Sequence, residues 1–306
     1  MKLTTKQLEF IRWTIGPAYL IGTLAIFWLW KQSGWSRYVV YYGASVCVIG
    51  LTQVLETVFP YEKSWRQPDS QFRNEVASTF LIANIGHNIG RALAYTLFGA
   101  FVVWWVPTGG PWWPKQLPFV AQVAIAFVFW ELGLYWNHRL MHSAAWRFHV
   151  LHHKLRRLSW INSGYGHPIG FLMTSFADLG VLLFIGAPAE VLLYVSFLSG
   201  AINFLSHCNI DMKMGWLNYV FVTPEVHRWH HANDPQSYGR NFGTQLIVWD
   251  LVFGTYYLPK DQVPGKLLGS DEHQPAGIVH QLLAPFMPRR AATWPGIARE
   301  REVAQS

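Results

Sequence analysis

Long apolar runs, separated by short charged stretches, dominate the pattern along the chain. Residues 13–30 and 38–55 are two runs of 18 residues without a charged side chain. An α-helix of that length extends about 27 Å, close to the roughly 30 Å hydrocarbon core of a bilayer. The two runs predict membrane-spanning helices. No small-residue cleavage pattern follows the first run, so we interpret it as a retained span rather than a signal peptide.

The next apolar run, residues 76–106, has 31 residues and a single charge, Arg91. A helix of that length is too long for one upright crossing of a bilayer. We therefore expect it to be either strongly tilted or broken near Gly90, because glycine weakens a helix.

Three more apolar runs follow in the second half of the chain. Residues 118–136 contain one charged residue, Glu131. Residues 169–189 and 191–206 are separated by a Gly-Ala-Pro sequence typical of a turn, which predicts a helical hairpin. The pattern predicts an all-α integral membrane protein with about four transmembrane helices plus a helical hairpin.

The composition agrees with a membrane protein. Charged residues make up 13% of the 306 residues, against roughly 25% in soluble domains. Aromatic residues make up 16% and include 17 Trp, a residue enriched at membrane interfaces. The apolar content excludes a disordered chain, and two cysteines exclude a disulfide scaffold.

The distribution of positive charge predicts the orientation of the spans. Lys and Arg are frequent in the N-terminal tail, in residues 60–75 and after Trp136, whereas residues 107–117 contain only Lys115. Positive loops stay on the cytoplasmic side. We therefore expect residues from His138 onward on the cytoplasmic face of a bacterial inner membrane or the endoplasmic reticulum, apart from the hairpin. Lys31 and Arg37 in the first outer loop run against this orientation.

Histidines cluster in this cytoplasmic part. His138 and His142 are four residues apart, and two sets repeat with spacings of three and four residues. Such spacings place side chains on one helix face. The two sets are His149, His152 and His153, then His227, His230 and His231; His207 stands between them. One zinc site uses three or four ligands. Nine imidazoles without a thiolate therefore suggest two metals of the Fe, Zn, Cu or Ni type.

These motifs resemble the fatty acid hydroxylase and sterol desaturase superfamily, which are integral-membrane di-iron oxygenases. The resemblance covers about residues 120–260. It rests on WNHRLMH at 136–142, HVLHHK at 149–154, TPEVHRWHH at 223–231, and NFG, WD and FGTY within 241–256. It implies transmembrane helices in residues 1–117, a di-iron catalytic domain in residues 118–260 with a cytoplasmic His-rich helical cap, and a C-terminal tail in residues 261–306.

The resemblance also implies the metal ligands. The three boxes contribute His138, His142, His149, His152, His153, His227, His230 and His231, and His207 matches a further ligand upstream of the last box. Some relatives have a second histidine four residues before that position, where this chain has Asn203. His167, in a Gly-His-Pro sequence, resembles a histidine of sterol-directed relatives and is the tenth candidate; alternatively, it holds a turn.

Several other polar residues are candidates with two interpretations each. Glu131 shares a helix face with His138 and is a candidate for the catalytic site, where it orients a ligand histidine or joins a proton path; alternatively, it is a charge that snorkels to the interface. Asp178 lies within the hairpin and is either functional or at a helix break that faces water.

His87, within a membrane run, fits a packing or cavity role better than a metal role, and Asp250 fits a structural role. Lys154, Arg156 and Arg157 either bind an acidic electron-transfer partner or are a positive-inside cluster.

The resemblance implies chemistry that needs two Fe ions, O2 and two external electrons; Zn can replace Fe in purified material. The substrate is then a fatty acyl, alkyl or sterol lipid that is hydroxylated, or alternatively desaturated. Thr223-Pro224 resembles alkylglycerol-monooxygenase-type relatives. Without a Gly-rich dinucleotide motif, the electrons come from a ferredoxin, rubredoxin, cytochrome b5 or reductase. No nucleic acid partner is expected. A membrane metal transporter and a zinc lipid hydrolase are the alternatives from other classes.

Overall fold

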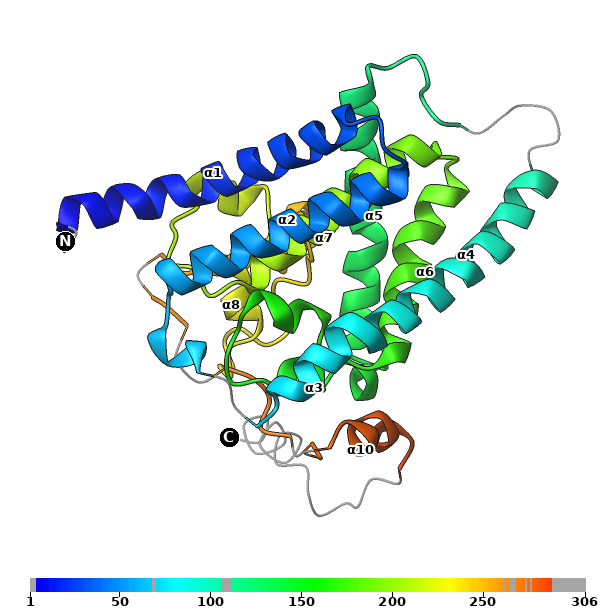
Figure 1. The fold of residues 1–306 in the computed structure, drawn as a ribbon. Helices are drawn as coiled ribbons and strands as arrows, with labels where there is room; N and C mark the ends of the chain where they lie inside the picture. Colours follow the sequence, from blue (N-terminus) through cyan, green and yellow to red (C-terminus); the bar gives the residue numbers. More distant parts are fainter. Residues whose placement is uncertain are drawn as a thin grey trace.

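The computed structural model describes residues 4–67, 70–105, 112–260, 262–264, 268–272, 274–275 and 277–287 (Figure 1). Within these ranges the chain is helical, with isolated β-bridges and no strands. The predicted all-α class is confirmed. Residues 288–306 of the predicted tail lie outside the described residues.

Four of the described helices are long and apolar enough to cross a membrane. They are α1 (Thr5–Gln32), α2 (Arg37–Val58), α5 (Phe119–Met141) and α7 (Ala189–His207). The hydroxyls of Thr4 and Ser36 cap the first two at their N-termini. Large apolar side chains such as Ile21, Val46 and Val120 are exposed on these helices, as expected where a protein faces lipid. The fold is that of an integral membrane protein.

The helices pack around α5 and α7. Helix α1 lies against α2, α2 lies against α7, and α7 lies against α5 (Figure 1). On the other side of α5, α6 (Pro168–Phe184) packs against both α5 and α4 (Ala83–Trp105). Helices α6 and α7 are joined by the predicted turn, where Gly186 has a positive φ of 75°, but they pack against α5 rather than against each other.

The long run at residues 76–106 is not broken at Gly90. Helix α3 (Phe72–Ala77), a π-helical turn (η2, Ser78–Ile82) and α4 follow one another without a gap. The irregularity lies at the π-turn, where the Ser78 and Thr79 hydroxyls donate to carbonyls of Gly164 and Ile161 at 2.9 and 2.6 Å. Of the two alternatives, the break near Gly90 was therefore wrong, because tertiary contacts and not the glycine determine where the helix deviates.

Gly90 instead allows α4 and α6 to approach closely. A Cβ atom at Gly90 would lie 2.3 Å from the carbonyl oxygen of Leu172, which is backbone and cannot give way. We expect Gly90→Ala to lower the free energy of unfolding by about 1–3 kcal/mol through overpacking. Gly99→Ala on the same helix is the matched control, since a Cβ there meets nothing within 4 Å. Equal thermal midpoints for the two variants in detergent would contradict this packing.

The cap of the molecule consists of short elements at the C-terminal ends of α5 and α7. They are η1 (Lys63–Arg66), η3 (Trp146–Phe148), η4 (His152–Lys154), η5 (Trp160–Gly164), η6 (Gly215–Tyr219), α8 (Pro224–His230), α9 (Val248–Phe253), α10 (Ile278–Leu283) and η7 (Ala284–Phe286). The second histidine box lies in 3-10 turns and not on an α-helix, so the helix-face interpretation of its spacing was wrong. The turns divide its imidazoles, with His149 and His153 in one group of histidines and His152 in another.

Candidate metal centre

Nine of the ten candidate ligand histidines meet in the cap as two adjacent groups. Within each group, the ligand nitrogens all lie within 4.8 Å of one another. The first histidine group is His138, His142, His149, His153 and His230, and the second histidine group is His152, His207, His227 and His231. The α5 and α7 ends, the turns after α5, and α8 supply them. Residues far apart in sequence thus form two compact all-nitrogen donor sets.

The spacing of the nitrogens fits metal coordination. In the second group, Nε2 of His227 lies 3.0 Å from Nε2 of both His207 and His231. In the first, Nε2 of His149 lies 3.0 and 3.2 Å from Nε2 of His138 and His153. Two nitrogens held about 2.1 Å from one ion at a right angle are about 3.0 Å apart. In both groups, one Nε2 atom has two other Nε2 atoms at this distance. A neutral imidazole nitrogen either donates one proton or accepts one, so it cannot form good hydrogen bonds with both neighbours. Coordination of a shared metal ion explains the spacing better.

Backbone carbonyls fix the orientation of four of the rings. Nδ1 of His138 donates to Phe242 O at 2.8 Å, and Nδ1 of His230 donates to Arg240 O at 2.9 Å. In the second group, Nδ1 of His152 and His207 donate to Tyr165 O and Asn203 O at 2.9 and 3.0 Å. A carbonyl only accepts, so Nδ1 carries the proton and the Nε2 lone pair is left for a metal.

Burial keeps the imidazoles outside the spanning helices neutral. It lowers the pKa of His152 and of His230 to about 4. Burial and the neighbouring imidazoles also hold the pKa of His149, His153 and His231 well below the ordinary value. Neutral imidazole is the form that binds metal, so this electrostatic environment suits the donor set.

The low pKa values predict acid sensitivity of the metal-free protein. Below pH 6.5, His152 and His230 take up protons in the unfolded chain but stay neutral in the folded chain until about pH 4. Proton binding therefore favours unfolding, by up to about 1.4 kcal/mol per pH unit for each histidine. We expect the thermal midpoint of the metal-free protein to fall as pH is lowered from 6.5 to 4. A midpoint that is constant over this window would contradict the neutral, buried state.

The tenth candidate, His167, lies outside both groups. It caps the N-terminus of α6, where its Nδ1 accepts from Ile169 N at 3.2 Å. Its Nε2 donates to Leu282 O at 3.0 Å, which joins the cavity wall to α10. Asn203, at the position of the missing histidine, accepts from His207 through its backbone carbonyl and also lines the cavity.

Glu131 is fully buried on α5, unlike a charge that snorkels to the interface. Its carboxylate accepts from the backbone N–H groups of Thr244 and Gln245 at 2.6 and 3.0 Å. Among the described residues, its hydrogen bonds go to Thr244 and Gln245 and not to a histidine. It therefore holds a loop that lines the cavity.

Asp250 in the closing WD motif has the structural role that the sequence suggested, and sequence reasoning missed only the link of this loop to the ligand histidines. The Asp250 carboxylate accepts from Phe242 N at 2.7 Å, Gly243 N at 2.6 Å and Thr255 Oγ1 at 2.6 Å. Asn241 has a positive φ of 55°, and its side-chain amide donates to Tyr257 O at 2.8 Å. These bonds hold the loop whose carbonyls at 240 and 242 orient two ligand histidines. The short separation of the two motifs, with NFG at 241–243 and WD at 249–250, was the signal in the sequence.

The three cations after the second box bind parts of this chain. Lys154 Nζ donates to Pro275 O at 2.9 Å, and Arg156 pairs with Asp271 at 2.8 Å. Arg157 is buried and forms an ion pair with Glu75 at 2.7 Å. These contacts hold the C-terminal segment and α3 against the second box. Docking of an electron donor at these cations stays a prediction.

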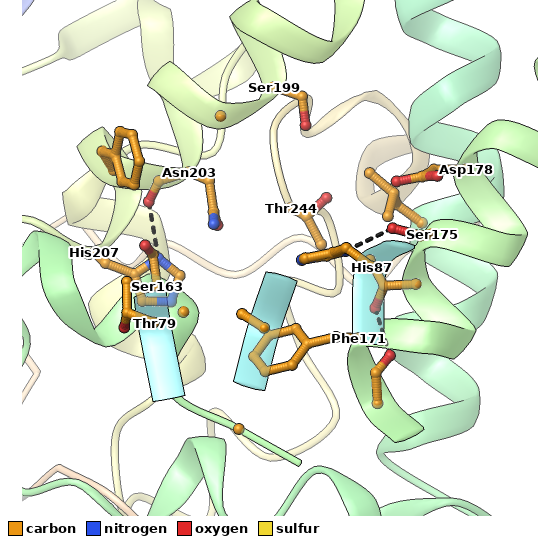
Figure 2. Close-up of a pocket in the computed structure, with 18 of the residues that line it drawn as sticks. Thr79, His87, Ser163, Phe171, Ser175, Asp178, Ser199, Asn203, His207 and Thr244 are labelled. Carbon is orange, nitrogen blue, oxygen red and sulfur yellow. Dashed lines mark hydrogen bonds between the residues drawn. The ribbon is translucent and has the colours of Figure 1, made fainter. Parts of the chain in front are cut away.

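A cavity of about 500 Å³ extends from the histidines into the space between the spanning helices. His138, His149, His152, His207 and His227 line its inner end. Figure 2 shows His207 and Asn203 on one side of the cavity, with His87, Ser175 and Asp178 on the opposite side. Tyr42 and Val46 on α2 and Phe80 in η2 also line it and are 63, 67 and 54% exposed. The cavity therefore reaches the lipid-facing surface between α2 and η2.

Comparison with known proteins gives a family. The sequence profile of the fatty acid hydroxylase family matches residues 123–255. The ornithine lipid hydroxylase of Rhizobium tropici is 35% identical over 252 residues, which cover 81% of this chain and 75% of that protein. An alkylglycerol monooxygenase of Caenorhabditis elegans is 27% identical over 57% of this chain and 34% of its own length. A methylsterol monooxygenase of Arabidopsis thaliana is 25% identical over 46% of this chain and 54% of its own length. No solved structure matches the chain significantly.

The fold and the site define a helical membrane protein with a buried, all-histidine centre that can hold metal. The chain belongs to the fatty acid hydroxylase family. The predicted family membership is thereby confirmed. So is the predicted class of enzyme, an oxidoreductase related to lipid hydroxylases and monooxygenases.

Proposed function

We propose that this protein is a membrane-bound di-iron hydroxylase. In this reaction one atom of O2 enters a C–H bond of a lipid, and the other leaves as water with two external electrons and two protons. The observation that carries the proposal is the pair of adjacent histidine groups at the inner end of a cavity that reaches lipid. The hydroxylase and monooxygenase names of the relatives favour hydroxylation over desaturation.

We assign the two irons to the two histidine groups, one ion to each. The five and four imidazoles are uncharged nitrogen donors, a set that suits iron and excludes Mg and Ca. When bound, such an iron pair supplies the reductive activation of O2 that amino-acid side chains do not carry out. Zinc remains the expected contaminant in purified material, since it binds such sites more tightly than ferrous iron.

The chain itself positions the substrate and the ligands. The cavity leads from the lipid-facing surface to five ligand imidazoles and so brings the lipid to them. Glu131 positions the Thr244–Gln245 loop on the cavity wall and does not itself reach the histidines. We assign it a positioning role in place of the predicted catalytic one. His167 anchors α10 to the same wall.

Two further parts of the proposal concern the surroundings of the enzyme. The electrons come from a ferredoxin, a rubredoxin, cytochrome b5 or a reductase, because the sequence has no Gly-rich dinucleotide motif. The positive charge around the histidine boxes favours the cytoplasmic face for the metal centre. The substrate is a membrane lipid, and an ornithine lipid is one candidate because of the relative's name.

The test compares total lipids from cells that express the intact chain or its His230→Ala variant. Mass spectrometry should find a lipid one oxygen atom heavier in cells with the intact chain and air. The product should be missing when O2 is withheld. A lipid change that persists without O2 would favour a hydrolase and contradict the proposal, and a product two hydrogens lighter would indicate a desaturase.

A further inference from the structure

Two opposite charges line the cavity away from the histidine centre. Arg91 comes from α4 and Asp178 from α6, the two helices that pack closely at Gly90. Asp178 is 6% exposed. In Figure 2 it lies across the cavity from His207. The cavity therefore combines a wall of ligand histidines with a charged wall on α4 and α6.

Within the described residues neither charge has an ion-pair partner, and the charge of Arg91 acts on the Asp178 carboxylate only from a longer distance. The hydrogen bond to the Asp178 carboxylate comes from the backbone N–H of Leu179, at 2.5 Å. A charged side chain among spanning helices is costly unless it meets a partner. Both charges face the cavity, so a ligand in the cavity is in position to provide the partners.

Neighbouring polar side chains continue the same wall. Nδ1 of His87 and Oγ of Ser175 are 2.5 Å apart and join α4 to α6. The His87 ring also lies against Phe171, with ring centroids 5.1 Å apart. His87 belongs to neither histidine group, so its place is on the cavity wall. Helices α4 and α6 thus present a polar strip where the outer surfaces of the spanning helices are apolar.

We propose that Asp178 and Arg91 recognise the polar headgroup of the substrate, with a ligand ammonium at Asp178 and a ligand carboxylate at Arg91. The substrate class is then a zwitterionic amino-acid lipid. This inference rests on the proposed hydroxylase function and makes it more specific. A neutral sterol or glycerol ether would leave each protein charge with only the distant opposite charge of the other, and would therefore bind less tightly than a zwitterionic lipid.

The experiment uses three matched lipids with the purified, iron-loaded enzyme in mixed micelles. They are an N-acyl-ornithine lipid with free ammonium and carboxylate, its N-acetylated form without the ammonium, and its methyl ester without the carboxylate. Turnover and KM are measured for the native chain, Asp178→Asn and Arg91→Gln. Glu190→Gln removes an exposed acid of the same helical hairpin and is the control.

We expect the native enzyme to show a KM about tenfold to a hundredfold higher for each modified lipid, the effect of losing one charge-assisted hydrogen bond. The Asp178→Asn variant should have similar KM values for the unmodified and the N-acetylated lipid, but should still have a higher KM for the methyl ester. The Arg91→Gln variant should have similar KM values for the unmodified lipid and the methyl ester, but should still have a higher KM for the N-acetylated lipid. Glu190→Gln should behave like the native enzyme.

Two results would overturn the inference. One is a native enzyme that oxidises the three lipids, or a neutral alkylglycerol, with equal KM; the hydroxylase function would then stand without this recognition site. The other is a variant that keeps the native discrimination. The native enzyme alone gives the first readout, so a misfolded variant does not obscure it. If the native enzyme oxidises no lipid at all, the proposed function itself fails.

Discussion

Replacing His227 with Ala should abolish turnover and remove about one metal ion per chain. His227 is the central residue of the second histidine group, with Nε2 at 3.0 Å from two other Nε2 atoms. Its loss breaks the donor set of one ion and leaves the first histidine group intact. The loss of activity should exceed the 10–100-fold effect typical of residues that only orient a ligand. Elemental analysis of the purified protein and lipid turnover measure the two effects.

The matched control for this variant is His280→Ala. His280 lies on α10, is exposed, and belongs to neither histidine group. It should retain full metal content and activity. A His227→Ala protein that binds as much metal as the native chain and turns over at a comparable rate would show that the second histidine group is not a metal site.

Replacing Asp250 with Ala should weaken both the fold and the metal centre. The buried N–H groups of Phe242 and Gly243 would lose their acceptor, at about 1–3 kcal/mol each. The Phe242 carbonyl would then no longer be held in place for Nδ1 of His138. We expect unfolding at lower denaturant concentration and a 10–100-fold loss of metal affinity.

Thr255→Val is the graded control, because it removes one hydroxyl donor to Asp250 and leaves both backbone bonds. The stability and the metal affinity of Thr255→Val should both lie between those of the native chain and those of Asp250→Ala. If Asp250→Ala lost stability but bound metal with native affinity, the closing motif would be purely structural, and its link to His138 would be wrong.

The pattern of apolar runs predicted the helices well because a membrane requires long apolar segments, whatever their partners. The position of the irregularity in the run before α5 was not predictable. It depends on hydroxyls of Ser78 and Thr79 that bond to carbonyls more than 80 residues away. The close contact at Gly90 depends in the same way on a second helix.

The spacing of the histidines predicted that they come together at one site. Which histidine belongs to which of the two groups could be determined only from the fold. His152 and His153 are neighbours in sequence and belong to different groups, because a 3-10 turn points their rings in different directions. His230 and His231 are divided likewise at the end of α8. His167 lies in a Gly-His-Pro sequence that resembles a histidine of sterol-directed relatives, yet its partners are a helix N-terminus and α10.

The most direct test of the central claim is the source of the added oxygen. Purified, iron-loaded enzyme would receive electrons from a ferredoxin and reductase in micelles of extracted membrane lipid under 18O2. The proposed function predicts a hydroxylated lipid that carries one 18O atom and does not form with His230→Ala. A product with oxygen from water, or the same product from the variant, would contradict a metal-dependent oxygenase at this centre.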